Sequence, residues 1–214
     1  MKNWLRNIAI VVMAISSLNS MAIEEENDTV YFFNSWEQVL KMKPAAMIVN
    51  PYISFTTAYD MIVETDDSKV NQKIEKEYMA ELLGGEFWYI NTEYLKKNFK
   101  GDAKYLEGYL PVFFNKKVAY FTAMKEFEYQ MANAITYVHD WVYYYYIDFE
   151  HRKVRRVDHK VLSDLLNDYH DLQVRYEGMK DYKKLDIIED YFLEFIDRAS
   201  IDETHPNILD LVDE

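Results

Sequence analysis

Four consecutive tyrosines stand inside the apolar segment Trp141–Phe149, which reads WVYYYYIDF. Aromatic and β-branched residues favour strands, and successive side chains of a strand point to opposite faces. One face would therefore carry Trp141, Tyr143, Tyr145, Ile147 and Phe149, and the other Val142, Tyr144, Tyr146 and Asp148. The first face is apolar throughout and is predicted to face the core. The second ends in an acid and is predicted to meet solvent or a covering pair of helices, so the chain needs a layered fold around this strand.

The second face of this strand is also the first candidate for ligand binding. Tyr144 and Tyr146 could form a platform on which a sugar or a flat ligand stacks, with Asp148 accepting a hydroxyl, and Trp88 is a further candidate for lining such a cleft. The alternative is that these tyrosines pack under C-terminal helices and point their hydroxyls outward, because tyrosine has an apolar body and a polar tip.

The rest of the chain predicts an α+β fold with an antiparallel sheet, which could be strongly curled, and short helices. Aromatic residues make up 16% of the chain, whereas it has only 5 Gly and 4 Pro, which argues against disorder. Strands are predicted over residues 29–33, 46–49, 86–90, 109–114, 117–122, 137–149 and 153–157, and one or two more over 53–65. Short helices are predicted over 34–40 and 93–99. Residues 68–83 fit a helix, with a charged hairpin as the alternative, and Pro111 predicts that its strand lies at an edge.

Two apolar stripes with helical spacing follow Asp158, which is predicted to cap the start of the first helix. One runs from Val161 to Leu172 and the other from Ile187 to Phe195, which predicts an antiparallel helix pair that covers one face of the sheet. The predicted organisation is a signal peptide over 1–22, a β-rich domain over 23–157, the helical pair over 158–200 and an acidic, fraying tail over 201–214.

The first 22 residues have the three regions of an export signal. Lys2 and Arg6 precede the apolar run from Ile8 to Ile15, and Ser20-Met21-Ala22 has the small-x-small form that signal peptidase cleaves. The run is short for a membrane helix, so no transmembrane segment is expected after cleavage. An uncleaved anchor or a buried helix is the alternative. The chain is therefore expected in the periplasm or outside the cell.

Charge and composition exclude several kinds of partner and chemistry. The net charge is −13, and loss of Lys2 and Arg6 from the 24 basic residues would leave 22 against 37 acidic ones. Such a chain should be repelled by nucleic acid and by anionic lipid. It has no cysteine, which excludes disulfides, thiolate metal sites and a cysteine nucleophile.

No catalytic motif stands out in the sequence. The histidines lack zinc-helix spacing, and neither a GxSxG elbow nor a phosphate-binding glycine loop is present. We therefore expect no metal site, no cofactor and no catalytic residue that can be named. A glycosidase needs a pair of carboxylates, and 37 acids offer too many pairs for the sequence to select one. The basic cluster over residues 151–156 is expected to pair across strands with Asp148, Glu150 and neighbouring acids, with an anionic polymer as the alternative ligand.

Two stretches carry a resemblance to a known family. They are VRYEGMKDYKK over residues 174–184, followed by IIEDYF over 187–192, and INTEYLKKNF over 90–99. They resemble a family of uncharacterised exported proteins from gut-dwelling anaerobic bacteria. The resemblance covers most of the mature chain, and it implies export and one globular unit but no site residue.

The function expected from the sequence is that of an exported, non-enzymatic protein of a bacterial envelope. Its partner would be a small molecule, a glycan or an envelope protein. The alternative is a hydrolase acting on glycans through an Asp/Glu pair that the sequence does not identify.

Overall fold

The computed structural model describes residues 29–55, 61–84, 87–130 and 136–212, and between residues 124 and 141 it describes the backbone alone. The predicted signal peptide, part of the strand predicted over 53–65 and the side chain of Trp141 lie outside these residues. The described elements are β1 (Thr29–Phe33), α2 (Trp36–Leu40), β2 (Ala46–Val49), β3 (Tyr52–Phe55), β4 (Met61–Glu64), α3 (Ser68–Lys76), β5 (Ala80–Leu83), β6 (Phe87–Asn91), α4 (Thr92–Asn98), β7 (Lys100–Gly101), η1 (Asp102–Tyr105), β8 (Tyr109–Phe114), β9 (Ala119–Gln130), β10 (Thr136–Asp148), β11 (Lys153–Arg156), α5 (His159–Leu165), η2 (Leu166–Asp168), α6 (His170–Glu177), α7 (Leu185–Ile201) and α8 (Ile208–Val212).

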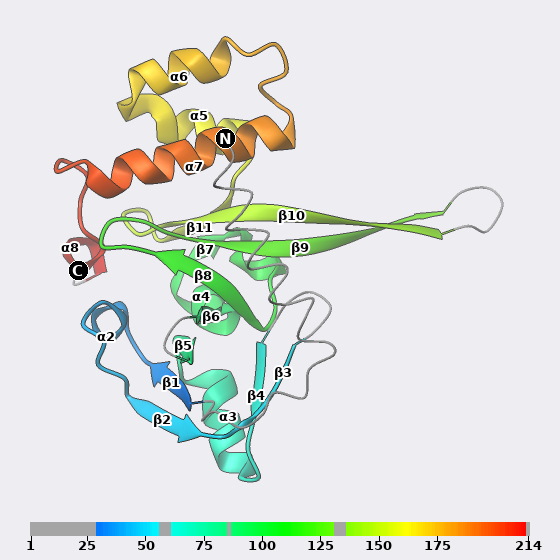
Figure 1. The fold of residues 1–214 in the computed structure, drawn as a ribbon, viewed down its shortest axis with the longest axis vertical. Helices are drawn as coiled ribbons and strands as arrows, with labels where there is room; N and C mark the ends of the chain where they lie inside the picture. Colours follow the sequence, from blue (N-terminus) through cyan, green and yellow to red (C-terminus); the bar gives the residue numbers. More distant parts are fainter. Residues whose placement is uncertain (1–28, 56–60, 85–86, 131–135, 213–214) are drawn as a thin grey trace.

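One mixed, mostly antiparallel sheet of 11 strands organises these elements, in the order β2-β1-β5-β6-β8-β9-β10-β11-β7 with the β3–β4 hairpin beside β8 (Figure 1). The short β7 pairs with β11 in parallel. The predicted α+β class is confirmed. The sheet is not curled, so that version of the prediction is wrong.

Strand β8 joins the two halves of the sheet. Residues Tyr109 to Pro111 pair with β6, whereas Val112 to Phe114 pair with β9. The prediction that Pro111 marks an edge strand is therefore wrong. The proline is tolerated inside the sheet because it stands at the residue where β8 changes partners, since pairing with β9 begins only at Val112.

The tyrosine strand separates two hydrophobic cores, one on each of its faces. Tyr145, Ile147 and Phe149 face a core that is closed by α2, α4 and α8. Tyr144 and Tyr146 face a second core, which is closed by α5, α6 and α7. Figure 1 shows α5, α6 and α7 stacked on one side of β10, with α4 on the other side. A third cluster lies under α3, between β1, β4, β6 and β8.

The C-terminal layer has three helices where the sequence predicts two. The first predicted helix begins at its cap, Asp158, which accepts from the backbone N–H groups of Lys160 and Val161 at 2.9 Å each. It then breaks at η2 and Tyr169, whose φ and ψ are −121° and 65°. Asn167 and Asp168 are poor helix formers, so the break falls where propensity is weakest.

Two further predicted elements differ in the structure. The predicted helix over 68–83 ends at Lys76, and Ala80 then begins β5, which lies between β1 and β6. The predicted fraying of the acidic tail is wrong for residues 208–212, because they form α8 and its Ile208 is completely buried. Helix α8 contacts α2, so the C-terminal helix closes on the second element of the described chain.

Candidate functional site

The two tyrosines predicted to form a stacking platform lie under the C-terminal helices. Tyr144 and Tyr146 are 8% and 9% exposed. The Tyr144 ring lies 5.7 Å from that of Phe192, and the Tyr146 ring meets Phe195 edge-on at 6.1 Å. The rings of Tyr144 and Tyr146 are therefore buried against side chains of α7.

Of the other two predicted site residues, Asp148 lies on the same strand face as this pair and Trp88 lies on the opposite face. Asp148 shares the strand face of Tyr146, but its carboxylate accepts from the backbone N–H of His151 at 3.0 Å and lies 3.1 Å from the His151 Nδ1. Trp88 lies in the first core, where its ring contacts Phe33 at 4.9 Å and Phe114 at 4.9 Å. The structure therefore brings Tyr144, Tyr146 and Asp148 onto one face and places Trp88 on the other.

The Tyr144 hydroxyl makes the polar contact that links the sheet to α7. It donates to Glu189 Oε1 at 2.8 Å across the edge of the second core. Burial raises the pKa of Tyr144 far above its usual range, and the Glu189 carboxylate adds to the effect. Burial also raises the pKa of Glu189, and the neighbouring Asp190 and Asp186 raise it further. This pair joins the layers at an interface where water is partly excluded.

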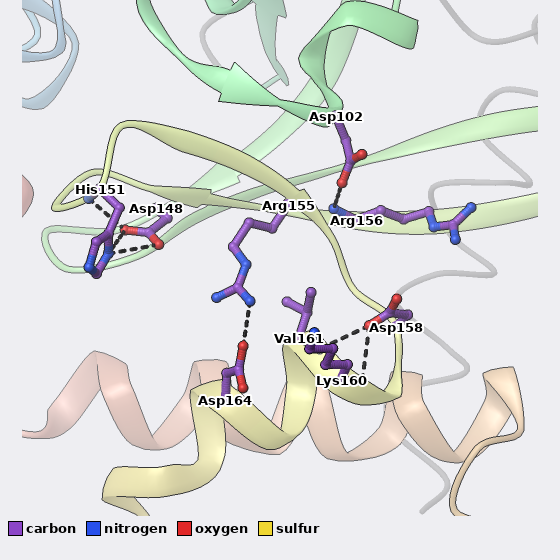
Figure 2. A network of polar contacts seen from close by, with 9 residues as sticks. All are labelled: Asp102, Asp148, His151, Arg155, Arg156, Asp158, Lys160, Val161 and Asp164. Carbon is purple, nitrogen blue, oxygen red and sulfur yellow. Dashed lines mark hydrogen bonds and ion pairs between the residues drawn. The ribbon is translucent and has the colours of Figure 1, made fainter.

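The basic cluster over residues 151–156 is held in a network of polar contacts (Figure 2). Arg155 donates to Asp164 of α5 at 2.5 Å, and the backbone N–H of Arg156 donates to Asp102 of η1 at 2.8 Å. The structure thus uses β11 to connect the helical layer with η1. Of the predicted partners, Asp148 contacts His151, and further acidic contacts come from Asp164 and Asp102, which lie on other elements.

Sequence reasoning missed a buried carboxyl group, that of Glu81 on β5. The side chain is completely buried, and neither carboxyl oxygen has a hydrogen-bond partner. Burial raises its pKa well above the usual value. The signal was an acid within the apolar run Ala80–Leu83, which the prediction of one helix over residues 68–83 did not single out.

The surroundings of Glu81 are aromatic and already hydrogen-bonded. Glu81 stands opposite Phe32 on β1 and Tyr89 on β6. The Tyr109 hydroxyl donates to the Ile74 carbonyl at 2.5 Å and accepts from Asn91 Nδ2 at 3.0 Å. The charge of Glu81 adds to the effect of burial in raising the pKa values of Tyr89 and Tyr109. An ionised Glu81 would therefore have no cation beside it in this cluster.

A two-stranded arm extends from the sheet next to the covered tyrosines. Strands β9 and β10 pair without interruption from Tyr120 and Tyr146 to Gln130 and Thr136. Pairing with β8 ends at Phe121, and pairing of β10 with β11 ends at Tyr145. Figure 1 shows the ribbon continuing past the end of α7, away from the rest of the sheet. At about 3.3 Å per residue, this two-stranded part is about 25–30 Å long.

No group of three or more His, Asp or Glu side chains able to hold a metal exists within the described ranges. None of the helices that the structure describes has the length and the apolar character needed to cross a bilayer.

Fold and contacts together define an α+β protein built on a mixed eleven-stranded sheet with a helical layer over its aromatic face. The chain belongs to a family of unknown function, DUF6563, which matches residues 50–198. No curated protein and no solved structure matches the chain.

Proposed function

We propose that this chain is an exported, non-enzymatic protein of a bacterial envelope and that it binds a protein partner through the β9–β10 arm. The observation that carries this proposal is the free pair of edges along the arm. Beyond Thr122 and Tyr143, the described strands β9 and β10 pair only with each other. An isolated two-stranded ribbon has marginal stability in water, and its outer N–H and C=O groups are ready to pair with another chain.

The glycan hydrolase receives less support from the contacts. A glycosidase needs two carboxylates about 5–10 Å apart beside an open cleft. Three acids near the aromatic strands or in the core are occupied or inaccessible: Asp148 binds His151, Glu189 binds Tyr144, and Glu81 is completely buried. Export rests on the pattern of residues 1–22 alone.

Site-specific cross-linking tests the arm in the cell that makes the protein. A photoreactive benzoylphenylalanine replaces Val142, whose side chain is 45% exposed near the base of the arm. The matched control carries the same group at Tyr105, which is 72% exposed on η1. We expect a discrete cross-linked species of higher mass from position 142 and none from position 105. Absence of that species, or equal products from both positions, contradicts the proposal.

Cell fractionation and N-terminal sequencing test export, with cleavage expected after Ala22.

A further inference from the structure

Part of the aromatic sheet face extends beyond the cover of α7. Phe113 on β8 stands opposite Tyr120 on β9, which stands opposite Tyr146 on β10, so these side chains share one face. Val142 lies two residues before Tyr144 and therefore belongs to the same face. Yet Phe113 is 43% exposed and Val142 is 45% exposed, whereas Tyr144 and Tyr146 are buried. The face thus continues from the second core into solvent.

Phe113 presents the flat side of its ring at this boundary. It stacks on Tyr120 with ring centroids 5.2 Å apart and planes within 18° of parallel. Tyr120 is in turn fixed by an edge-on contact with Phe192 of α7 at 5.6 Å. One side of the Phe113 ring is therefore held against the protein, and its exposure leaves the other side to solvent. Such ring faces attract Lys and Arg side chains.

The side of α7 next to this face is acidic. Asp186, Asp190 and Asp197 are exposed and are spaced by four and seven residues, which places them along one side of the helix. Two of them act on strand tyrosines. Burial raises the pKa of Tyr120 to about 12, with Asp197 contributing, and Asp190 adds to the raised pKa of the buried Tyr144. Within the described part of the chain, none of the three aspartates has an ion-pair partner within salt-bridge distance.

We propose that a basic segment of the protein partner lies along this acidic–aromatic face, which consists of Phe113, Val142, Asp186, Asp190 and Asp197. Its Lys or Arg side chains would pair with the three aspartates and lie over the Phe113 ring, while its apolar side chains would cover Val142. This inference rests on the proposed function and names the chemistry of the partner.

Charge complementarity selects this occupant over the others. A second copy of the chain carries the same net charge of −13 and would be repelled, as would an anionic membrane. A basic segment is instead attracted over a distance, and its charges meet aspartates that no cation of the described chain neutralises. The face is also continuous with the base of the arm, so one partner could contact both.

Fluorescence anisotropy with a defined probe tests the inference on the full chain. The probe is a labelled peptide of about twelve residues in which Arg and Leu alternate, long enough to follow the face in an extended form. A second peptide carries Glu in place of Arg. We expect the Arg peptide to bind and to be released by added salt, and the Glu peptide not to bind.

Two matched triple variants locate the binding. D186N/D190N/D197N should weaken binding of the Arg peptide at least about five-fold, because three exposed ion pairs are lost. D66N/E75Q/E77Q changes the net charge equally around α3 and should leave the affinity nearly unchanged. Phe113→Leu keeps an apolar side chain but removes the ring face, so it should also weaken binding. Thermal unfolding checks that each variant is folded.

Equal affinity of the two triple variants, or no binding of the Arg peptide to the folded wild type, overturns the inference. A partner cross-linked from Val142 together with no binding of the Arg peptide leaves the proposed function standing and rejects the basic segment. Binding of the Arg peptide without any partner cross-linked from Val142 leaves the affinity of the face for basic segments standing and rejects the proposed function of the arm.

Discussion

Replacement of Glu81 by Gln should stabilise the protein, and the gain should grow as the pH rises. Burial raises the pKa of Glu81 in the folded state well above its ordinary value, whereas in the unfolded chain the pKa is that of a free glutamate, about 4.3. When the pKa of an acid is raised in the folded state, its contribution to stability is fully present below the pKa of the unfolded state. That contribution is lost as the pH rises through the pKa of the folded state. The glutamine side chain cannot ionise, so the variant escapes this loss.

The magnitude follows from proton linkage. Between the unfolded and the folded pKa, the unfolded state has released one more proton than the folded state, which lowers the free energy of unfolding by about 1.4 kcal/mol per pH unit. From pH 5 to pH 7 the difference between the Glu81→Gln variant and the wild type should grow by up to about 2.7 kcal/mol. That is a large part of the roughly 5–15 kcal/mol that stabilises a typical domain.

Urea unfolding of both proteins at several pH values measures this difference directly. Other titrating groups, such as Glu189 with its raised pKa, cancel because both proteins contain them. Glu64→Gln on β4 is the matched control, since Glu64 is exposed and its replacement should shift stability little at any pH. A difference between Glu81→Gln and wild type that stays constant with pH, or shrinks as the pH rises, would refute the reasoning.

Substitutions at three other positions test the packing of the protein and the capping of α5. Gly101→Ala should lower the free energy of unfolding by at least about 2 kcal/mol, because Gly101 has a φ of +88° and an added Cβ would lie 2.5 Å from the Val154 carbonyl oxygen. Chemical denaturation measures this loss. A stability equal to wild type would contradict the close approach of β7 and β11. Phe192→Ala, which empties a completely buried site against Tyr120 and Tyr144, should cost about 3–5 kcal/mol, and Phe192→Leu should cost less. Asp158→Ala should cost about 1 kcal/mol by removing the cap of α5, and Asp158→Asn should recover most of it.

Short-range patterns predicted much of this fold. The alternation in the tyrosine strand predicted that Tyr145 faces the core and that Tyr144 faces solvent or the helical pair, and the structure places Tyr144 in a second core under the helices. The cap at Asp158 and the strands Thr29–Phe33 and Ala46–Val49 were equally visible, since each depends on neighbouring residues.

The features that sequence reasoning missed depend on distant partners. Val70, Ile74, Tyr78 and Leu82 share a helical spacing, yet β1 and β6 together provide two hydrogen-bonding edges that draw Ala80–Leu83 into the sheet. The burial of Glu81 follows from that pairing, so it was hidden by the same error. The candidate platform could not be judged either, since its exposure depends on where α7 lies.

The arrangement of β1 has a consequence for how the family is delimited. The family match begins at residue 50, but β1 fills the gap between β2 and β5 with Val30 and Phe32 completely buried. A protein trimmed to residues 50–198 would lack both β1 at its N-terminal end and α8 at its C-terminal end. It would open one side of β5 and uncover apolar side chains, which invites aggregation. The matched range is therefore smaller than the described sheet with its covering helices, and expression trials should retain both flanks.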